Sequence, residues 1–550
     1  MLKIKNVSSL EKILPTVENS AAEFNGYSCL LGERFSYQVT FIGDSEWGGA
    51  KRVNITVDSD LGDNIKIYEV GCVSAMTPGY PTEYDNGFIT RQPAIIPDIL
   101  TPIDGTTTIS TLYYKSIWVT VDVPNDTKPG IHSIRIRFEG KEGINGESVF
   151  NLNVIAAELP EQSLIFTEWF HCDCIASYYK TEPLSEEHLS YIDKFMHMAS
   201  ENGVNMLLTP IFTPPLDTEI GSERPTVQLI DVEFSNGVYS FGFDKLKRWL
   251  EMCKKNKIEY IEISHLFSQW GANNTPKIVV RENGKNIKKF GWHTDSLSDE
   301  YKDFLKQLLP ELTAFLKDNW DSKKIYFHIS DEPNSGHIEI YGMISKFIKP
   351  YLKDFNLIDA ISHYEIYKMG YIDTPVSTIL TIDDFIEHGV KNVWAYYCCC
   401  EGKFNLPNRF IAMPSYRNRI MGELLYKYNI NGFLHWGYNF YYSQLSTKLI
   451  NPFITNDADG GFPSGDSFSV YPGQDGPLPS LRLFVFYDAI QDIRAMKLAE
   501  KLVGRDTVMR LVEEHGDVTF RDYPTGADYI LNLRRKINKL IDDYSTTENY

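Results

Sequence analysis

The sequence predicts a multidomain fold class, in which an N-terminal antiparallel β-sandwich is followed by a (β/α)8 TIM-type barrel with C-terminal helices. Three observations in the 550 residues lead to this prediction. Residues 1–158 carry short runs of alternating apolar and polar side chains, and residues 163–504 alternate apolar strand patterns with amphipathic helix patterns. Residues 505–550 carry further helical periodicity. We therefore predict a sandwich domain at 1–158, a barrel at 163–504 and a helical segment packed on the barrel at 505–550.

The strands of the sandwich are predicted by period-2 alternation between clusters of Gly, Pro, Asp and Asn. They are RFSYQVTF (34–41), KRVNITVDS (51–59), DNIKIYEVG (63–71), SIWVTVDVP (116–124), IHSIRIRFEG (131–140) and ESVFNLNVIA (147–156). Short strands at this spacing, separated by turn signals such as NDTKPG (125–130), are typical of two packed antiparallel sheets.

Eight apolar segments are predicted to form the barrel strands. They are LIFTEWFH (164–171), NMLLTPIF (205–212), IEYIEISH (258–265), KIYFHIS (324–330), DAISHYEI (359–366), STILTI (377–382), NVWAYYC (392–398) and GFLHWGYN (432–439). Amphipathic helices are predicted over 186–201, 243–255, 299–318, 338–352, 415–429 and 480–502, because apolar residues recur there at i, i+3 and i+4. The fifth crossover, around 367–375, lacks a helix pattern, and residues 226–243 read as an inserted hairpin with Asn236-Gly237 at its turn.

The charge balance argues against several classes of partner. The sequence has 54 Lys and Arg against 73 Asp and Glu, a formal charge of −19, which repels phosphate backbones and anionic lipid. We therefore expect no nucleic-acid and no membrane partner. No apolar run reaches the roughly 18 residues of a spanning helix, and residues 1–20 contain no apolar signal core. The eight cysteines do not have the spacing of a disulfide framework. We expect a cytoplasmic protein, although a secreted chain that has lost its leader has the same features.

Histidines, carboxylates and aromatic residues follow the predicted barrel strands, where the βα loops build the functional face of this fold. The residues that we predict to contact a substrate are His171, Asp173, Tyr364, Trp394, Tyr396, Trp436 and Tyr438. Aromatic rings stack on the C–H faces of sugars, and carboxylates bind their hydroxyls, so the group indicates a carbohydrate partner. Each of these residues taken alone is about equally well explained by a position in the core or behind the site.

The sharpest feature is Asp331-Glu332-Pro333 at the end of the fourth predicted barrel strand. Two adjacent carboxylates are costly to bury unless each has a partner or a task, and one of them can be held protonated by the charge of the other. Successive strand residues point to opposite faces, so both can reach one site only if the chain leaves strand geometry at Ser330-Asp331. The alternative explanation is that Asp331 caps the following helix.

Three segments together resemble glycoside hydrolase family 123 and the wider uncharacterised group that shares its barrel domain. They are HISDEP (328–333), YPGQDGPLPSLRLFVFYDAIQD (471–492) and VTVDVPNDTKPG (119–130). The resemblance spans both domains and implies a retaining hydrolase of β-linked 2-acetamido-2-deoxy sugars (GalNAc or GlcNAc), of the β-N-acetylgalactosaminidase type, that works by substrate assistance. Glu332 would be the general acid/base, and Asp331 would accept a hydrogen bond from the acetamido N–H. The sequence departs from the family in the late helix at 486–492, which favours the wider group with an unknown sugar.

Two other functions stay open. A retaining glycosidase with a protein nucleophile would use Glu365, Glu168 or Glu401, although each could equally be an ion-pair residue. A non-catalytic glycan-binding protein is the alternative from another class, since folds do not fix functions. We expect no metal and no cofactor, because His171, Cys172, Asp173 and Cys174 are adjacent and on a strand would point alternately to opposite faces.

Overall fold

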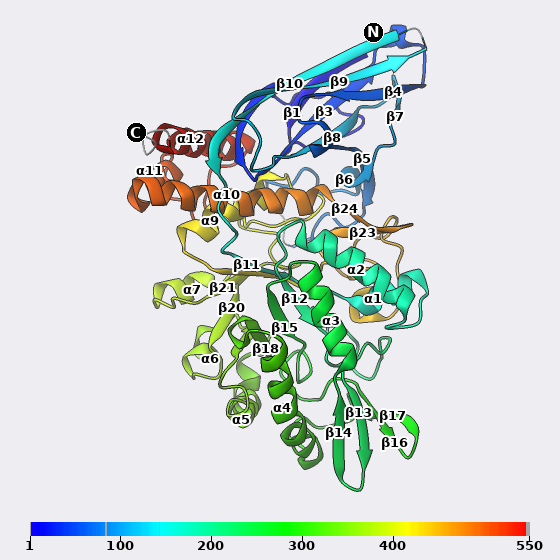
Figure 1. Ribbon diagram of the computed structural model, residues 1–550, viewed down its shortest axis with the longest axis vertical. Helices are drawn as coiled ribbons and strands as arrows, with labels where there is room; N and C mark the ends of the chain where they lie inside the picture. The colour runs from blue at the N-terminus through cyan, green and yellow to red at the C-terminus, as the bar shows by residue number, and fades with distance from the viewer. Residues whose placement is uncertain (1, 83–84, 142, 546–550) are drawn as a thin grey trace.

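The computed structural model describes residues 2–82, 85–141 and 143–545. Figure 1 shows two tiers, a β-sandwich and a closed parallel barrel, with one long helix, α10 (Leu481–Val503), lying along the boundary between them. Within these residues no helix combines the length and the apolar composition needed to cross a bilayer.

The predicted sandwich is present and consists of two five-stranded sheets, which contain four strands more than the six predicted: β1, β2, β6 and β7. The first sheet has the order β1 (Leu2–Ser8), β3 (Arg34–Gly43), β8 (Lys115–Asp122), β5 (Ile65–Ala75) and β6 (Ala94–Pro102). The second has the order β2 (Gly26–Leu31), β10 (Gly143–Glu158), β9 (Gly130–Gly140), β4 (Lys51–Asp58) and β7 (Thr106–Ile109). The pairs in both sheets are antiparallel except β10 with β2, which is parallel. Apolar side chains from alternate positions fill the space between the sheets, with Tyr37 and Phe150 stacked at 4.1 Å.

Eight parallel strands close the barrel because the last strand pairs with the first. They are β11 (Ile165–Glu168), β12 (Met206–Thr209), β15 (Tyr260–Ile263), β18 (Ile325–His328), β19 (Asn356–Ala360), β20 (Thr374–Thr378), β21 (Trp394–Tyr396) and β22 (Gly432–His435). The connecting helices are α1 (Cys172–Tyr179), α2 (Glu186–Ser200), α3 (Asp244–Lys255), α4 (Asp299–Asn319), α5 (Ile338–Ile348), α6 (Tyr364–Lys368), α7 (Ile382–Glu387), α8 (Tyr416–Arg419), α9 (Met421–Lys427) and α10 (Leu481–Val503). Two tail helices follow, α11 (Arg505–Val512) and α12 (Ala527–Ser545).

Two of the barrel strands lie upstream of their predicted positions. The fifth strand was expected at 359–366 but is β19 at Asn356–Ala360, and the sixth was expected at 377–382 but is β20 at Thr374–Thr378. Residues that follow each strand instead form the short helices α6 and α7. The alternation of apolar residues continues past the strand ends, so the sequence pattern does not mark where pairing stops.

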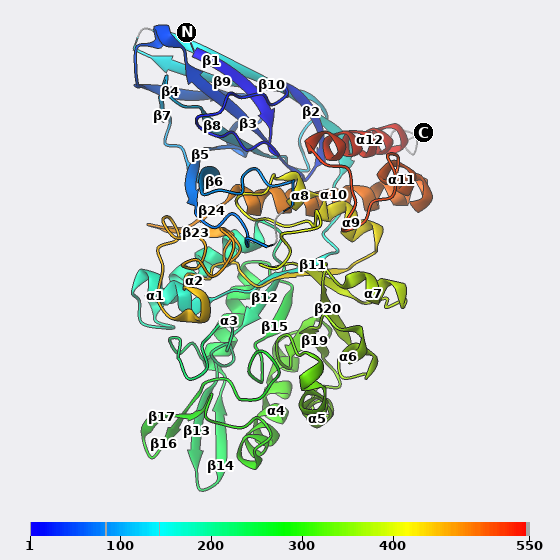
Figure 2. The same cartoon turned by 180° about the vertical axis from the view of Figure 1, so that it is seen from behind.

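The predicted hairpin is β13 (Asp231–Ser235) and β14 (Val238–Gly242), with Asn236 at a left-handed φ of 51° in the turn. It joins a second hairpin, β16 (Ile278–Glu282) and β17 (Lys285–Phe290), in a four-stranded sheet. This sheet extends from the barrel at the end opposite the sandwich, as the reverse view in Figure 2 also shows. A further hairpin, β23 (Val470–Gly473) with β24 (Gly476–Pro479), leads into α10.

Buried charges join the sandwich to the helices of the barrel. Arg534 of α12 donates to Asp492 of α10 at 2.8 Å and to Glu33, in the turn between β2 and β3, at 2.6 Å. Asp492 also accepts two hydrogen bonds from Arg419 of α8, at 2.7 and 3.0 Å. A second bridge runs from Arg482 at the start of α10 to Asp98 of β6 at 2.7 Å. Since α10 contacts both tiers through these pairs, the domain boundaries at 158 and 504 stay predictions.

Replacing Arg534 by Met should lower the free energy of unfolding by about 3 kcal/mol, since breaking a buried charge pair leaves carboxylates without their partner. Glu33 loses its cation, whereas Asp492 keeps Arg419. The measurement is the urea concentration at the midpoint of the first unfolding transition. Lys539→Met removes an exposed ion pair on the same helix and should leave that midpoint unchanged. An unchanged midpoint for Arg534→Met would show that its ion pairs with Glu33 and Asp492 do not stabilise the contact between the sandwich and the helices.

Candidate functional site

A cavity of about 370 Å³ lies at the carboxyl ends of the barrel strands. Its lining includes Asp331 and Glu332 after β18, Tyr396 at the end of β21 and Trp436 after β22. Two other hollows are larger, one of about 500 Å³ at the amino ends of β12 and β15 and one of about 790 Å³ beside the β23–β24 hairpin. Because the βα loops supply the functional groups of a parallel barrel, the 370 Å³ cavity is the candidate active site.

The chain leaves strand geometry where the two adjacent carboxylates occur. Strand β18 ends at His328, and Glu332 has a left-handed φ of 45°. Asp331 makes an isolated parallel bridge to Gln269, and its carbonyl oxygen accepts a hydrogen bond from the N–H of Trp270 at 2.8 Å. Both carboxylates therefore line one cavity, which a regular strand would not allow. The strand ends at His328, two residues before the exit expected at Ser330-Asp331, and the left-handed residue follows at Glu332.

The following helical segment has its own cap. Oδ1 of Asn334 accepts a hydrogen bond from the N–H of Gly336 at 2.9 Å, and a capping box with His337 completes the turn. The alternative in which Asp331 serves as that cap is therefore wrong.

The buried carboxylate of Asp359, on β19, holds the end of β18. It accepts hydrogen bonds from the backbone N–H of Ile329 at 3.0 Å and of Ser330 at 3.2 Å. The hydroxyl of Tyr341, from α5, donates to its other side at 2.5 Å. Buried backbone N–H groups need such partners, because the ladder with β19 ends at His328. Asp359 thus fixes the two residues that precede the carboxylate pair.

His328 lies between two buried carboxylates. Its Nε2 is 2.5 Å from Oε1 of Glu262, and its Nδ1 is 3.1 Å from Oδ1 of Asp359. Burial alone would lower the pKa of His328, but hydrogen bonds to Asp359 and Glu262 raise it to about 9. The imidazole is therefore a cation at neutral pH, and its charge acts to lower the pKa of Asp331.

Both carboxyl groups of the pair have raised pKa values. Burial is the main cause for Asp331, followed by the charge of Glu332. Enclosure also raises the pKa of Glu332, against the hydrogen bond that Tyr396 Oη donates to its Oε1 at 2.7 Å. Interacting carboxyl groups titrate as a pair. The pair therefore keeps one proton at pH values where an isolated carboxyl group is ionised.

Aromatic rings from distant parts of the chain form the cavity walls. The indole N–H of Trp169 donates to Glu262 at 2.8 Å, and that of Trp436 donates to Asp466 at 3.0 Å. Trp270 is 41% exposed. Tyr80 reaches the cavity from the connection between β5 and β6 of the sandwich. Of the predicted substrate contacts, Tyr396 and Trp436 are in the lining. The lining also contains Trp169, Trp270 and Tyr80, which were not predicted as contacts. No pattern in the sequence around Tyr80 indicates that it reaches the barrel.

His171 and Asp173 lie behind the cavity wall. Arg224 donates to both oxygens of Asp173 at 2.7 Å, and its Nη1 donates to the carbonyl of Leu216, a lining residue, at 2.9 Å. His171 is 2% exposed, and its Nε2 contacts the carbonyl of Trp436 at 2.8 Å. Burial and the charge of Arg224 lower the pKa of His171 to about 3, so the ring is neutral. These residues support the wall and do not face the cavity.

The remaining predicted contacts lie outside the lining as well. Trp394 is buried in the barrel, packed on Tyr326 at 5.2 Å. Tyr438 is buried, and its hydroxyl donates to the carbonyl of Phe195 at 2.9 Å. Tyr364 begins α6 and stacks on His388 at 4.0 Å. The residues Cys172 and Cys174 begin α1 and are not on a strand, which corrects the expected strand geometry there.

A third carboxylate, Asp217, lines the cavity and was not recognised in the sequence. It lies in the long connection after β12, and its Oδ2 accepts a hydrogen bond from the N–H of Leu445 at 3.0 Å. Burial raises the pKa of Asp217 to about 6, against that hydrogen bond and the charge of Arg224. The predicted strand at 205–212 ends five residues before it, but no adjacent carboxylate or motif marks it in the sequence.

The three nucleophile candidates named from the sequence are placed elsewhere. Glu168 is buried against Arg409 and accepts a hydrogen bond from Ser469 at 2.7 Å. Glu365 is exposed and lies 3.6 Å from Lys368. Glu401 is buried, bonded to Thr378 and to the backbone N–H of Cys398, and burial raises its pKa to about 8.

Two groups of side chains have metal-ligand chemistry at close range among the described residues. His265, His328 and Asp359 lie together, but His328 already uses both ring nitrogens on Glu262 and Asp359, which leaves it no lone pair for a cation. The second group is the run of three cysteines at 398–400, whose sulfur atoms lie within 4.8 Å of one another.

Comparison with known proteins places the chain. Residues 169–499 match the sequence profile described as "Glycoside hydrolase 123, catalytic domain". A family 123 glycoside hydrolase from Clostridium perfringens, described in a study of glycolipid glycan hydrolysis, has a similar structure, with 16% identity, a TM-score of 0.72, and coverage of 99% of this chain and 98% of that one. A family 5 mannosidase from Rhizomucor miehei has 12% identity and a TM-score of 0.34, covering 61% of this chain and 94% of its own. Curated protein sequences give no match.

The first structural match shows the same fold over nearly the whole of both chains. The profile match covers more than half of the 550 residues and contains the carboxylate pair, the cysteine run and most of α10. The chain therefore belongs to glycoside hydrolase family 123 and is a glycosidase acting on carbohydrate.

Proposed function

We propose that the protein hydrolyses β-linked 2-acetamido-2-deoxy sugars, GalNAc or GlcNAc, with retention of configuration and by substrate assistance. The observation that carries the proposal is the pair Asp331 and Glu332, two adjacent carboxylates that line one cavity through the left-handed residue Glu332. In this scheme the acetamido oxygen of the substrate attacks C1, so the enzyme needs an acid/base and an acetamido-orienting group in place of a nucleophile.

Glu332 is the proposed general acid and base. Its carboxyl protonates the leaving oxygen and, after the aglycone departs, deprotonates the incoming water. Enclosure raises its pKa, which suits a group that must hold a proton near neutral pH. Tyr396, hydrogen-bonded to Oε1, fixes the direction of the carboxyl group.

Asp331 is the proposed partner of the acetamido N–H. As a carboxylate it would orient the acetamido carbonyl toward C1 and stabilise the positive charge that develops on the oxazolinium-like intermediate. The N–H of the bound substrate favours the ionised form of Asp331, as does the His328 cation. Substrate binding would therefore leave the proton of the pair on Glu332, where the leaving group needs it.

A retaining mechanism with a protein nucleophile is the second candidate, favoured by one observation: Asp217 is a further carboxylate in the cavity lining. In that scheme Asp217 would attack C1 and Glu332 would remain the acid/base. Glu168, Glu365 and Glu401 have little support in this role, because none of them is in the lining.

A purely glycan-binding role has less support than either enzymatic scheme. Mutual repulsion and burial of Asp331 and Glu332 lower stability, and a binding protein gains nothing from keeping both. Membership of a glycoside hydrolase family also favours an enzymatic role over a purely glycan-binding one.

Glu332→Gln should lower kcat for nitrophenyl β-glycosides of GalNAc or GlcNAc by about 10²–10⁴, the usual contribution of general acid–base catalysis. The measurement is release of nitrophenol by the purified protein. Glu365→Gln changes an exposed carboxylate outside the cavity and should retain wild-type kcat. Equal losses in the two variants would contradict the assignment.

Substrates that differ only at the acetamido group separate the two schemes. Plain β-glycosides without this group should not be hydrolysed, and stepwise fluorination of its methyl should lower kcat/KM, because fluorine withdraws electrons from the attacking oxygen. Asp331→Asn should lower kcat by about 10²–10³, and Asp217→Asn by clearly less. Hydrolysis of plain glycosides together with the larger loss in Asp217→Asn would establish the protein-nucleophile scheme instead.

Tyr396→Phe should move the basic limb of the kcat/KM profile to higher pH. The hydroxyl of Tyr396 lowers the pKa of Glu332. Its removal should therefore raise that pKa, so that Glu332 stays protonated up to a higher pH. A hydrogen bond of about 0.5–1.5 kcal/mol corresponds to a shift of about half to one pH unit. A limb that moves to lower pH, or does not move, would contradict the contact.

A further inference from the structure

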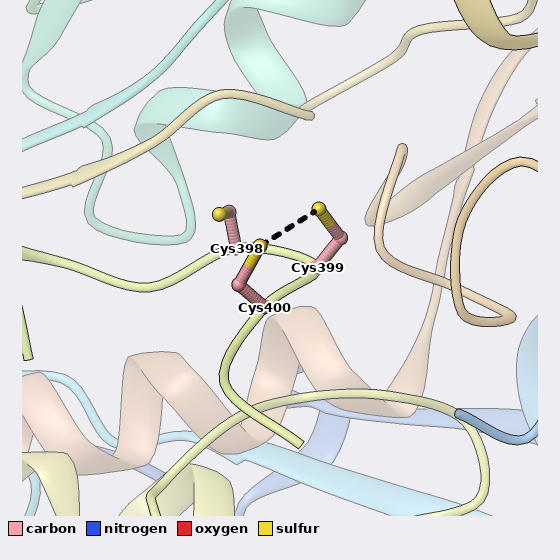
Figure 3. A group of neighbouring side chains, drawn as sticks. All are labelled: Cys398, Cys399 and Cys400. Atoms are coloured by element: carbon pink, nitrogen blue, oxygen red, sulfur yellow. Dashed lines mark hydrogen bonds between the residues drawn. The ribbon is translucent and has the colours of Figure 1, made fainter. Parts of the chain in front are cut away.

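Three consecutive cysteines form one side of the active-site cavity. Cys398, Cys399 and Cys400 all line it, together with Asp331 and Glu332. Their sulfur atoms lie within 4.8 Å of one another, and the sulfurs of Cys399 and Cys400 are 3.8 Å apart. Figure 3 shows the three side chains on one turn, with the sulfur of Cys400 drawn between the other two. The catalytic scheme above uses none of them.

The turn that carries these cysteines is held by buried polar contacts. The carboxylate of Glu401 accepts a hydrogen bond from the backbone N–H of Cys398 at 2.8 Å. Asn408, fully buried, donates to the carbonyl oxygens of Cys398 at 2.8 Å and of Glu401 at 3.2 Å. These bonds fix the backbone at both ends of the run, so the close approach of the sulfurs is part of the folded structure.

The spacing of the sulfurs matches that of thiolates around a soft cation. A Zn–S bond of about 2.3 Å in a tetrahedral site places neighbouring sulfurs about 3.8 Å apart. The sulfurs of Cys399 and Cys400 already have this separation, and Cys398 is within 4.8 Å of both. A side-chain rotation that moves one sulfur by about 1 Å would bring all three thiolates to the spacing of a single metal site.

We propose that Cys398, Cys399 and Cys400 bind one thiophilic d¹⁰ cation, of which Zn²⁺ is the physiological example, and that its binding inhibits hydrolysis. The three thiols release their protons to solvent, the three sulfurs coordinate the cation, and no electron is transferred. Three protein ligands leave the fourth position to water. All three cysteines line the cavity of only about 370 Å³, so the bound cation and its water would compete with the sugar for space.

Cadmium titration tests the binding directly. Cd²⁺ has the same preference for thiolates and gives a thiolate-to-metal charge-transfer absorbance in the ultraviolet, which requires no substrate. The protein is kept reduced with a phosphine, which leaves no competing thiol, and its free thiols are counted first. We expect one equivalent of Cd²⁺ to saturate the absorbance, and Zn²⁺ to displace it.

Variants assign the site. Cys400→Ser and the double variant Cys399→Ser with Cys400→Ser should weaken Cd²⁺ binding by more than the roughly 10–100-fold that loss of an outer-shell partner costs. Cys72→Ser removes an exposed cysteine of the sandwich and serves as the matched control, with unchanged binding expected. Equal saturation in the wild type and in the double variant would overturn the proposed site.

Inhibition is measured in the same samples. Zn²⁺ should raise KM for the glycoside in the wild-type protein and in Cys72→Ser, and should have no effect on Cys400→Ser. Binding by absorbance without any change in hydrolysis would overturn the inhibitory part of the proposal. If no acetamido glycoside proves to be a substrate, the proposed function fails while the absorbance test still decides the metal site.

Discussion

The hydrogen bonds from the backbone of Ile329 and Ser330 to the carboxylate of Asp359 are the constraint on which the active site depends. They end the ladder of β18 and hold the chain while it turns into the left-handed residue Glu332. A non-glycine residue in that region costs about 1–2 kcal/mol, so the surroundings must impose it. Without this departure one member of the carboxylate pair would point into the barrel wall, and the two carboxylates would not share a cavity.

A chain of buried, hydrogen-bonded charged groups supports the end of β18. The His328 cation lies between Glu262 and Asp359, and Glu262 in turn accepts hydrogen bonds from Thr167 and from the indole of Trp169. One buried network therefore links four barrel strands, β11, β15, β18 and β19, and reaches the backbone of Ser330, next to the carboxylate pair. A satisfied network of this kind is rigid, because leaving any member without its partner costs more than the bond itself contributes.

The sequence was sufficient for the architecture and for finding two carboxylates that line the cavity, and insufficient for most of the wall. Period-2 and period-3.6 patterns depend on local burial, so they predicted the sandwich, the hairpin at Asn236 and the order of the barrel strands. Asp331-Glu332 was recognisable because adjacent carboxylates after an apolar strand are unusual. The direction in which a side chain points does not follow from the local pattern. His171 follows a barrel strand but contacts Arg224. Trp394 lies on a barrel strand but packs on Tyr326 in the barrel interior. Tyr80, Asp217 and Asp359 owe their positions to contacts with residues far away in the chain.

The sandwich contributes a side chain to the wall of the candidate active site. Tyr80, in the connection between β5 and β6, lines the cavity and donates a hydrogen bond to the carbonyl of Gly461 at 2.8 Å. Its position depends on β6, which is tied to α10 by the Asp98–Arg482 pair, and on the network around Arg534. A side chain from a loosely tethered domain would have to be ordered at each binding event, at a cost in conformational entropy. The buried ion pairs between the sandwich and the helices avoid that cost, because they hold Tyr80 in the cavity wall before a sugar binds.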